Sequence, residues 1–317
     1  MHFSINKIKK EGVELIVLGD EKTANSVSII PGVGAALHEF TVQTPGGAIQ
    51  IIDNYNELAQ AKIQMGVSYK SAKLSPFVCR VPDGKYFFDD REWEFTNKFM
   101  DGSAIHGLLY NKPFVITDEI VDEKEAAVSM QYDYAMDDPG YPYRYTCRVK
   151  YALYDDNILS LQTVITNKTN KPIPVADGWH PYFQLGGNVD EWMLVFDVQA
   201  IVEFNDKLIP TGKLLKYDLF KSFTKIGSTF FDNCFLLNNK IEGAACQLFN
   251  PENKLKLSFF PDSGYPYLQI YTPPHRKSIA IENLSSAPDS FNNKMGLLIL
   301  PPGDSKSFTV RYQLSWA

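Results

Sequence analysis

The sequence has few cysteines and few histidines, and this scarcity already narrows the class of protein. Of its 317 residues, only four are cysteine and five are histidine. The cysteines contain no CxxC pair and have no histidine beside them at ligand spacing, which argues against a zinc motif and against a disulfide framework. We therefore interpret them as buried or half-buried thiols of a reducing compartment. They are Cys79, Cys147, Cys234 and Cys246.

The chain also lacks a basic block, a long apolar run and a recognisable leader. It has 31 Lys and Arg against 37 Asp and Glu, a formal net charge of −6, which is poorly suited to binding the phosphate backbone of nucleic acid. No apolar run approaches the ~20 residues that cross a bilayer. Residues 1–19 contain lysines but neither the apolar segment nor the cleavage site of a signal peptide. The sequence therefore predicts a cytoplasmic protein with no nucleic-acid partner and no membrane partner.

Aromatic residues and strand-like alternation, by contrast, are abundant. Phe, Tyr and Trp make up 13% of the chain, beside 19 Pro and 20 Gly, a composition typical of turn-rich β proteins. Residues 145–153 alternate apolar and polar side chains, residues 155–157 favour a turn, and residues 158–166 begin a second strand, which together predict a hairpin. The same strand-and-turn pattern recurs at residues 13–19, 26–30, 48–53, 85–95, 192–198, 254–260, 267–272, 296–300 and 307–316.

Helical periodicity is scarce. Residues 55–65 are the best candidate for a helix, with Asn54 or Asn56 as its N-cap. Strands at short spacing with few helices predict a β sandwich rather than a parallel α/β sheet. Because no repeat, low-complexity tract or linker divides the chain, we predict one all-β domain over residues 1–317.

Two of the five histidines stand in segments that favour a functional site. His106 is flanked by glycines, and His180 lies among aromatic residues next to a turn, in residues 177–183. A lone histidine is more often a hydrogen-bonded structural residue, so on the residues alone both interpretations stay open. No comparable context surrounds the other three histidines, His2, His38 and His275.

Three charged residues stand in apolar segments, where each needs a partner or a polar cleft. Glu282 lies in the strand-like residues 278–283, on the face opposite the isoleucines. Asp232 lies among phenylalanines, although a turn aspartate that caps its own backbone is the alternative. Arg80 is an isolated charge in a third apolar segment.

These features fit a cleft that binds a sugar. Aromatic faces pack against the C–H patches of a sugar ring, and charged groups make paired hydrogen bonds to neighbouring hydroxyls. A carboxylate and an imidazole are also the two groups needed to take a proton from one oxygen and give one to another. Only a long-range fold could bring these residues together.

The motifs resemble those of the aldose 1-epimerase (galactose mutarotase-like) family, in the family's order and over nearly the whole chain. The arginine, His-Gly and His-x-Tyr-Phe-x-Leu segments resemble SPFVCRVPDGKYFF (residues 75–88), IHGLLYNKPF (105–114) and DGWHPYFQL (177–185). The Asp-x-x-Phe, Gln-x-Tyr-Thr and glutamate segments resemble FFDNCFLL (230–237), LQIYTP (268–273) and IAIENLSSAPDSFN (279–292).

The resemblance implies a fold and an activity. The fold is a galactose mutarotase-like β supersandwich, and the activity is an isomerase that interconverts the α and β anomers of a hexose with no metal and no organic cofactor. The implied catalytic residues are the base Glu282, the acid His180 and the second donor His106. The implied substrate-binding residues are Arg80, Asp232 and Gln269. We expect a small-molecule sugar as the partner, and a monomer or weak dimer.

Departures from the family pattern leave the sugar and the activity open. Cys79 replaces an asparagine, Leu108 stands where many mutarotases have a second glycine, and residues 177–179 replace the usual Thr-Asn, which puts a preference for galactose in doubt. A hexose-6-phosphate 1-epimerase is one alternative, although only Lys112 stands where that branch carries an arginine. A non-catalytic carbohydrate-binding protein of the same fold is the other, because fold alone does not separate it from an enzyme.

Overall fold

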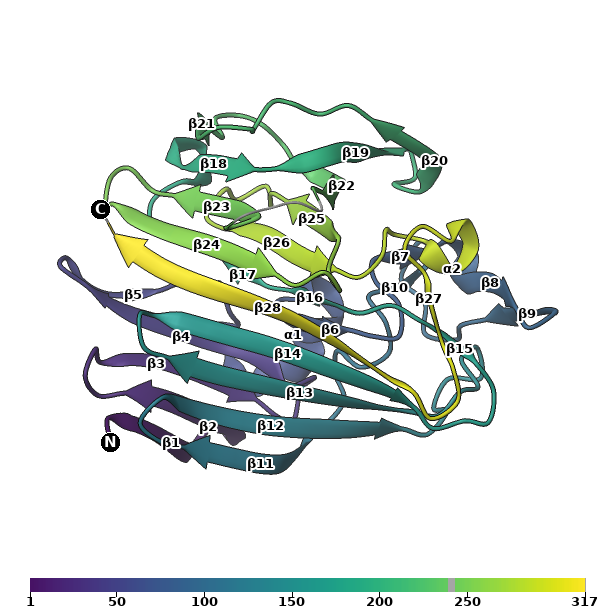
Figure 1. Ribbon diagram of the computed structural model, residues 1–317, viewed down its shortest axis with the longest axis horizontal. Helices are drawn as coiled ribbons and strands as arrows, with labels where there is room; N and C mark the ends of the chain where they lie inside the picture. Colours follow the sequence, from purple (N-terminus) through teal and green to yellow (C-terminus); the bar gives the residue numbers. More distant parts are fainter. Residues whose placement is uncertain (239–242, 317) are drawn as a thin grey trace.

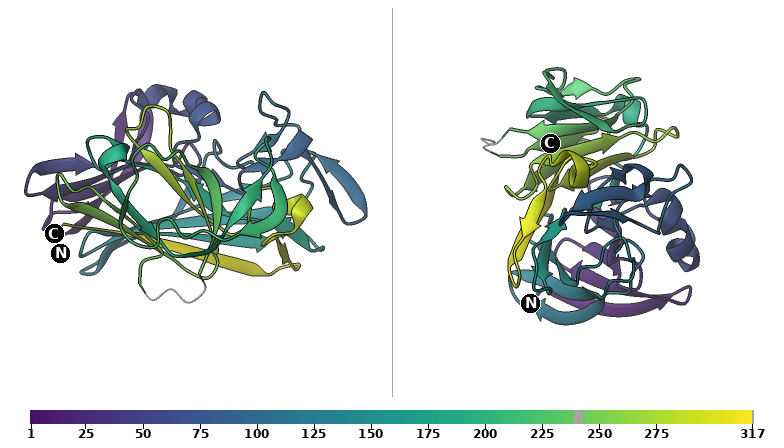
Figure 2. Two further views of the ribbon diagram at one scale, coloured as in Figure 1. Left: turned by 90° about the horizontal axis from the view of Figure 1, so that it is seen from above. Right: turned by 90° about the vertical axis from the view of Figure 1, so that its right-hand side faces the viewer.

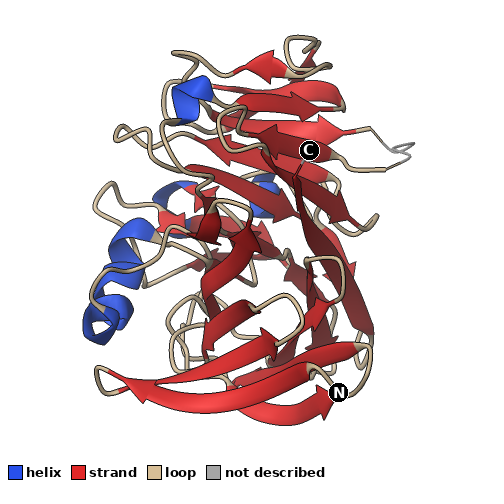
Figure 3. Cartoon of the chain, turned by 90° about the vertical axis from the view of Figure 1, so that its left-hand side faces the viewer, coloured by secondary structure: helices blue, strands red, loops and turns tan. Residues whose placement is uncertain are grey.

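The computed structural model describes residues 1–238 and 243–316. Strands predominate in this part of the chain, and the helices are few and short (Figure 3). The helical segments are η1 (Leu58–Gln60), α1 (Ala61–Ser68), η2 (Pro82–Gly84), η3 (Val189–Glu191) and α2 (Ser290–Asn293). Among the described residues, no helix has both the length and the apolar character needed to span a membrane. The prediction of an all-β protein is confirmed.

The largest sheet has nine antiparallel strands. In spatial order they are β11 (Val115–Val121), β12 (Glu125–Tyr134), β13 (Tyr145–Tyr154), β14 (Ile158–Asn167), β28 (Ser305–Trp316), β24 (Leu255–Pro261), β23 (Cys246–Phe249), β18 (Met193–Phe196) and β21 (Thr224–Lys225). The last strand of the chain, β28, lies between β14 and β24 (Figure 1). In β14 every second residue is buried, so one face of the sheet packs on the core, as the alternating sequence predicts.

A second large sheet carries most of the residues singled out above. Its strands, in spatial order, are β20 (Pro210–Leu215), β19 (Val198–Phe204), β22 (Asp232–Leu237), β25 (Tyr267–Tyr271), β26 (Ile279–Leu284), β16 (Gly178–His180) and β6 (Ala72–Leu74), and β17 (Tyr182–Phe183) also pairs with β26. Every residue of β26 is buried. Ile279 and Ile281 lie in the core on one face, whereas Glu282 borders a cavity on the other.

A five-stranded sheet at the N-terminus and three two-stranded ladders complete the described fold. The sheet contains β1 (Phe3–Lys10), β2 (Val13–Asp20), β3 (Asn25–Ile30), β4 (Ala36–Thr44) and β5 (Gly47–Gln50). The ladders pair β7 (Arg80–Val81) with β10 (Ala104–Ile105), β8 (Lys85–Phe88) with β9 (Arg91–Glu94), and β15 (Ile173–Val175) with β27 (Leu298–Leu300). The β8–β9 hairpin projects from one end of the molecule (Figure 2).

Aromatic contacts join the two large sheets into a sandwich. The ring centroid of Phe183 lies 5.1 Å from that of Phe259 and 5.2 Å from that of Tyr312, and Trp179 lies 5.7 Å from Tyr151. Each pair joins a strand of the second sheet to one of the nine-stranded sheet. Because aromatic side chains bury more apolar area than most others, these pairs form a large part of the core between the sheets.

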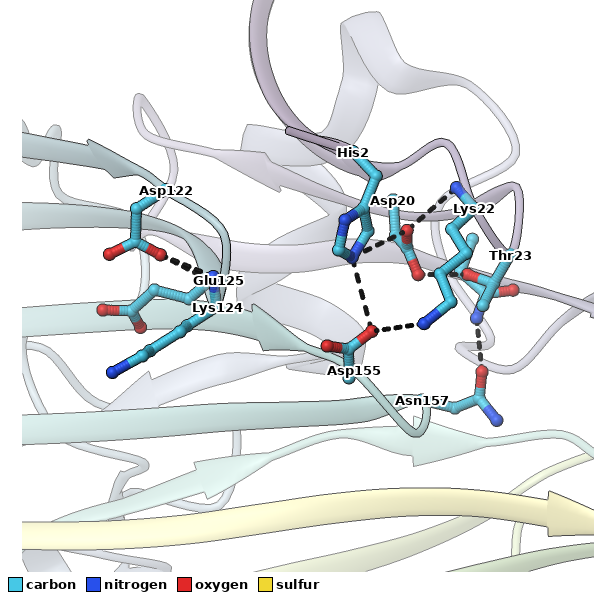
Figure 4. Close-up of polar contacts among 10 residues, drawn as sticks. His2, Asp20, Lys22, Thr23, Asp122, Lys124, Glu125, Asp155 and Asn157 are labelled. Carbon is cyan, nitrogen blue, oxygen red and sulfur yellow. Dashed lines mark hydrogen bonds and ion pairs between the residues drawn. The ribbon is translucent and has the colours of Figure 1, made fainter.

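Polar contacts attach the N-terminal segment to the turn between β13 and β14 (Figure 4). His2 Nε2 lies 3.3 Å from Asp155 Oδ1 and 3.7 Å from Asp20 Oδ1. Lys22 Nζ lies 3.4 Å from the same oxygen of Asp155. Since Asp155 and Lys22 are largely exposed, their ion pair contributes at most about 1 kcal/mol to stability. None of these residues borders the cavity described below.

The predicted hairpin at residues 145–166 is confirmed as β13 and β14, but the predicted helix is misplaced. Helix α1 begins at Ala61 and ends at Ser68, and no side chain caps it. Residues 58–60 of the predicted helix form the 3₁₀ helix η1, and residues 55–57 lie outside both, with the buried Tyr55 donating its hydroxyl to the carbonyl oxygen of Lys70. The prediction of Asn54 or Asn56 as the N-cap is therefore wrong.

Residues 85–95, predicted as a strand-and-turn unit, form the two strands β8 and β9. Asp89 and Asp90 turn the chain between them, with φ angles of 54° and 56°. Aspartate is one of the few residues that adopts this left-handed region readily, so the Asp-Asp pair is a turn signal.

Candidate active site

A cavity of about 530 Å³ lies on the face of the second sheet that points away from the core. Its volume falls within the range of small-molecule sites. All six residues predicted from the sequence border it: Arg80, His106, His180, Asp232, Gln269 and Glu282. Residues scattered over two-thirds of the chain are thus brought to one place.

Three adjacent strands present one polar side chain each to the cavity. Asp232 begins β22, Gln269 lies in β25, and Glu282 lies in β26 directly opposite Gln269 in the register. Gln269 Nε2 donates a hydrogen bond to Asp232 Oδ1 over 3.0 Å. Asp232 therefore binds a side chain of the neighbouring strand, and its alternative interpretation as a turn residue is wrong.

His180 ends β16 beside Glu282. The distance from His180 Nε2 to Glu282 Oε1 is 3.3 Å, and only 6% and 2% of the two side chains are exposed. The ring of Tyr182 stacks on the imidazole, with centroids 5.0 Å apart and planes inclined by 22°. A carboxyl group and an imidazole thus share the floor of the cavity, shielded from water on one side by an aromatic ring.

The small β7–β10 ladder brings Arg80 and His106 to the same cavity. Arg80 pairs in register with Ile105, and the backbone amide of His106 donates to the carbonyl oxygen of Cys79 over 2.7 Å. Gly107 follows with a φ of 78°, and a Cβ there would lie 2.4 Å from the carbonyl oxygen of Ser75. Only glycine fits this close approach, which is the physical reason for the glycine of the His-Gly motif.

His106 and Arg80 are each held by neighbours. The His106 ring lies 4.8 Å from the His180 ring and nearly perpendicular to it, and 4.6 Å from the ring of Tyr69. Arg80 pairs with Asp101, and its Nη1 lies 3.3 Å from Ser103 Oγ. The guanidinium and the two imidazoles therefore have fixed orientations around the cavity.

Burial dominates the electrostatics of the site. It raises the pKa of Glu282 well above its usual value, and the nearby carboxylate of Asp232 raises it further. It lowers the pKa of His180 to about 4. Burial, the neighbouring His180 and Arg80 lower the pKa of His106 well below its usual value. The pKa of Asp232 is raised by burial, against the opposing effect of Arg80. Each charged form is therefore costly here unless a ligand solvates it.

Several buried polar atoms of the site have no hydrogen-bond partner among the described residues. They are Nδ1 of His106 and of His180, Oε1 of Gln269 and Oε2 of Glu282. Buried polar atoms are almost always paired in folded proteins, so a bound water or a polar ligand would complete these atoms beside the cavity. A molecule with several hydroxyl groups offers the required donors and acceptors.

The same residues could also hold a divalent metal ion. His106, His180 and Glu282 each offer one ligand atom, and these atoms lie within 4.8 Å of one another. Two imidazoles and one carboxylate are a donor set that transition metals accept. The chemistry of the donor set therefore permits a metal as well as direct proton transfer, and the two are separated by experiment below.

Sequence reasoning missed further residues of the cavity wall. Lys70 borders it, with Nζ 2.6 Å from Asp53 Oδ1, and His275 stands at the same wall although its sequence context was unremarkable. In the sequence, nothing but its position shortly after the predicted helix distinguished Lys70. Lys112, in contrast, lies outside the cavity and pairs with Asp137, its Nζ 2.7 Å from Oδ2.

Comparisons with known proteins agree with this geometry. The family model described as aldose 1-epimerase matches residues 14–313. The protein of Escherichia coli K12 named YihR, described as uncharacterized, is 26% identical over 278 residues, which cover 86% of this chain and 84% of YihR.

Solved structures show the same fold at lower sequence identity. A galactose mutarotase-like protein from Clostridium acetobutylicum superposes with a TM-score of 0.88 at 19% identity, covering 100% of this chain and 99% of its own. Galactose 1-epimerase from Lactobacillus acidophilus NCFM superposes with a TM-score of 0.82 at 17% identity, covering 99% of both chains. The resemblance predicted from the motifs is confirmed: the chain belongs to the aldose 1-epimerase family and has the galactose mutarotase-like β supersandwich fold.

Proposed function

We propose that the protein is an aldose 1-epimerase, an isomerase that interconverts the α and β anomers of a hexose. The observation that carries this proposal is the 3.3 Å contact between His180 Nε2 and Glu282 Oε1 at the floor of the cavity. Mutarotation requires one group that accepts a proton and one that donates a proton at two oxygens bonded to the same carbon. A buried carboxyl and imidazole in contact supply that pair.

The reaction follows from the positions of these two groups. Glu282 takes the proton of the C1 hydroxyl while His180 gives a proton to the ring oxygen, so that the bond between C1 and the ring oxygen breaks and C1 becomes an aldehyde. Rotation about the C1–C2 bond presents the other face of the carbonyl group. The open chain recloses with the two proton transfers reversed, which restores both side chains. Because the sugar carries both reacting ends, the protein supplies proton transfer and positioning.

The protonation states of Glu282 and His180 suit this exchange of protons with the sugar. Burial disfavours the charged forms of both Glu282 and His180, so the empty pair shares one proton over a wide pH range. Sugar hydroxyls that donate to the Glu282 carboxylate stabilise its ionised form and leave the proton on His180. The two forms of the pair, which differ only in where that proton lies, correspond to the closed sugar and the open-chain intermediate.

The remaining predicted residues bind and orient the sugar. His106 stands beside His180 as a second donor toward the ring oxygen. Arg80, Asp232 and Gln269 lie on the same side of the cavity, where a cation, a carboxylate and an amide together suit neighbouring hydroxyls. The aromatic rings of Tyr182 and Tyr271 offer apolar faces to the C–H side of the sugar.

A 6-phosphorylated aldose is the second candidate substrate, because Lys70 brings an ammonium group to the cavity wall. Its charge is already paired with Asp53, so a phosphate would have to compete with that carboxylate. The retained base and acid favour an enzyme over a non-catalytic sugar-binding protein of the same fold, which needs neither proton transfer.

The test is a mutarotation assay by polarimetry or NMR with pure anomers of free and 6-phosphorylated aldoses. We expect the protein to accelerate equilibration of at least one of them above the spontaneous rate. Binding of a sugar, measured by calorimetry, without any acceleration would contradict the proposal and identify a carbohydrate-binding protein. Acceleration confined to the phosphorylated sugars would identify the hexose-6-phosphate enzyme.

A further inference from the structure

A fully buried ion pair lies behind the floor of the cavity. Lys73 Nζ is 2.6 Å from Asp177 Oδ2, and neither side chain is exposed at all. Lys73 lies in β6, and Asp177 directly precedes β16, the strand that ends in His180. In the register Lys73 stands opposite Trp179, and its ammonium lies 4.5 Å from the centre of that ring. The pair therefore faces the core side of the sheet, away from the sugar.

Hydrogen bonds connect the pair, or the backbone of Asp177, to residues in or next to β16, β25 and β26. Lys73 Nζ also donates to the carbonyl oxygen of Gly178 over 3.0 Å, two residues before His180. Tyr265, just before β25, donates its hydroxyl to Asp177 Oδ1 over 2.6 Å. Ser285, just after β26, bonds to Asp177 twice: its Oγ accepts from the Asp177 amide, and its own amide donates to the Asp177 carbonyl, both over 2.8 Å.

The backbone connects the strands of His180 and Glu282 at only a few points. Strands β16 and β26 share a single register pair, Gly178 with Leu284, before the chain bends at Pro181 into β17. Gly178 allows β16 to lie close to Leu284 of β26, because a Cβ there would lie 2.6 Å from a methyl carbon of Leu284. The two bonds of Ser285 to the Asp177 backbone add to this attachment, and the Asp177 carboxylate in turn holds the same segment to Lys73 and Tyr265.

Stability alone does not account for such a pair. Removing two charges from water is costly, and replacing a buried ion pair by uncharged residues of similar size often leaves a protein as stable or more so. What buried ionic groups can supply instead is a unique arrangement of the elements they join. Here the joined elements are the strands of the acid and the base.

We propose that Lys73 and Asp177 are positioning residues that fix the imidazole of His180 relative to the carboxyl group of Glu282. Neither touches the substrate; they act through the segment 177–180 and through Ser285. This inference rests on the proposed function, because its main readout is the rate of mutarotation. A displacement of about 1 Å between catalytic groups can cost about 10²-fold in rate, so a loosened strand lowers kcat while sugar binding changes little.

The test compares a charge-free double variant with the wild type. Lys73→Met with Asp177→Asn removes both charges and keeps the shapes of the side chains. We expect a melting temperature close to that of the wild type, a KM within about threefold, and a kcat lower by at least about tenfold. The two limbs of the pH profile of kcat should also move toward each other, because a longer distance weakens the coupling between His180 and Glu282.

A matched control removes an ion pair elsewhere. Lys150 and Glu125 pair between β12 and β13 of the nine-stranded sheet, with Nζ 3.1 Å from Oε1. Lys150→Met with Glu125→Gln should leave kcat, KM and the pH profile unchanged. A second variant, Tyr265→Phe, removes one bond to the Asp177 carboxylate without removing any charge and should lower kcat in the same direction. This second variant tests the positioning role if the double variant does not fold.

The outcomes separate this inference from the proposed function. A folded double variant, or a folded Tyr265→Phe variant, with wild-type kcat and pH profile would overturn the positioning role. Loss of kcat only in proportion to the fraction of unfolded protein would overturn it as well. If the wild type itself accelerates no mutarotation, the proposed function fails. The positioning role is then tested by NMR titration of the His180 imidazole. An unchanged titration in the folded variants overturns the role, and a shifted one supports it.

Discussion

Gln269 and Glu282 are direct register partners across β25 and β26, and the amide of Gln269 also binds Asp232 on the other side. The amide thus lies between two carboxyl groups, and its Oε1 has no partner among the described residues. Asp232 raises the pKa of Glu282, after the larger effect of burial. The binding side of the cavity and its proposed catalytic pair are therefore coupled electrostatically through one strand.

We expect Glu282→Gln to fold normally and to lose at least about 10²-fold in kcat, because the variant keeps the shape of the base but cannot accept a proton. Polarimetry gives the rate, and circular dichroism gives the thermal unfolding. Near wild-type mutarotation by a folded variant would remove Glu282 from the mechanism.

The two histidines should differ in their kinetic signature. His180→Asn removes the acid, an interaction that matters mainly in the transition state, so kcat should fall with little change in KM. His106→Asn should affect both parameters, with the smaller loss in kcat. Because both groups act on one oxygen, the double variant should be less damaged than the product of the single effects. A larger loss of kcat in His106→Asn would reverse the two roles.

Asp232→Ala should raise KM more than it lowers kcat. Its carboxylate is proposed to bind sugar hydroxyls, and a hydrogen bond to a charged group is worth about 1.5–3 kcal/mol, or roughly ten- to hundredfold in affinity. Calorimetric titration of the sugar with the variant measures this directly. An unchanged KM for every sugar tested would contradict a binding role.

The pH dependence of kcat/KM should be bell-shaped. Below the lowered pKa of His180, about 4, the pair takes up a second proton and no base remains; above the raised pKa of Glu282 it loses its single proton and no acid remains. Rates measured from about pH 3 to about pH 9, corrected for spontaneous mutarotation, give both limbs. In Glu282→Gln the bell should collapse, because only one titrating group of the pair is left. A flat wild-type profile would be inconsistent with the pair.

Treatment with a chelator should leave kcat unchanged, because the proposed proton transfers use Glu282 and His180 themselves. The measurement is mutarotation before and after dialysis against EDTA, with metal content determined by mass spectrometry. Loss of activity that Zn²⁺ or Mn²⁺ restores would instead assign His106, His180 and Glu282 as metal ligands.

Much of the fold could be predicted because a strand that buries one face alternates apolar and polar residues along the sequence. In β14 this signal was complete, and the strand was predicted to within one residue. At residues 55–65 the helical pattern was misleading, because the α-helix begins only at Ala61, after the 3₁₀ helix η1. Local sequence context singled out five of the six cavity residues, and the family motifs added Gln269 and the expectation that all six meet in one site.

The Lys73–Asp177 pair could not have been predicted in the same way. The two residues lie far apart in the sequence, and which residue of β6 faces which residue of β16 depends on the register of strands that share few backbone bonds. A lysine in an apolar stretch was the only available signal, and it does not identify its partner. That residues 1–317 form one domain, and that the protein is a monomer or weak dimer, stay predictions.

The four cysteines should make the protein resistant to oxidation and alkylation. All are buried and unpaired, and burial raises the pKa of each thiol, that of Cys147 to about 12. Cys79 even borders the cavity, where the carboxyl group of Glu282 disfavours its thiolate further. Since peroxide and alkylating reagents attack the thiolate, Cys79 should resist both although it lies in the cavity wall. The purified protein should accordingly need no reducing agent to stay active.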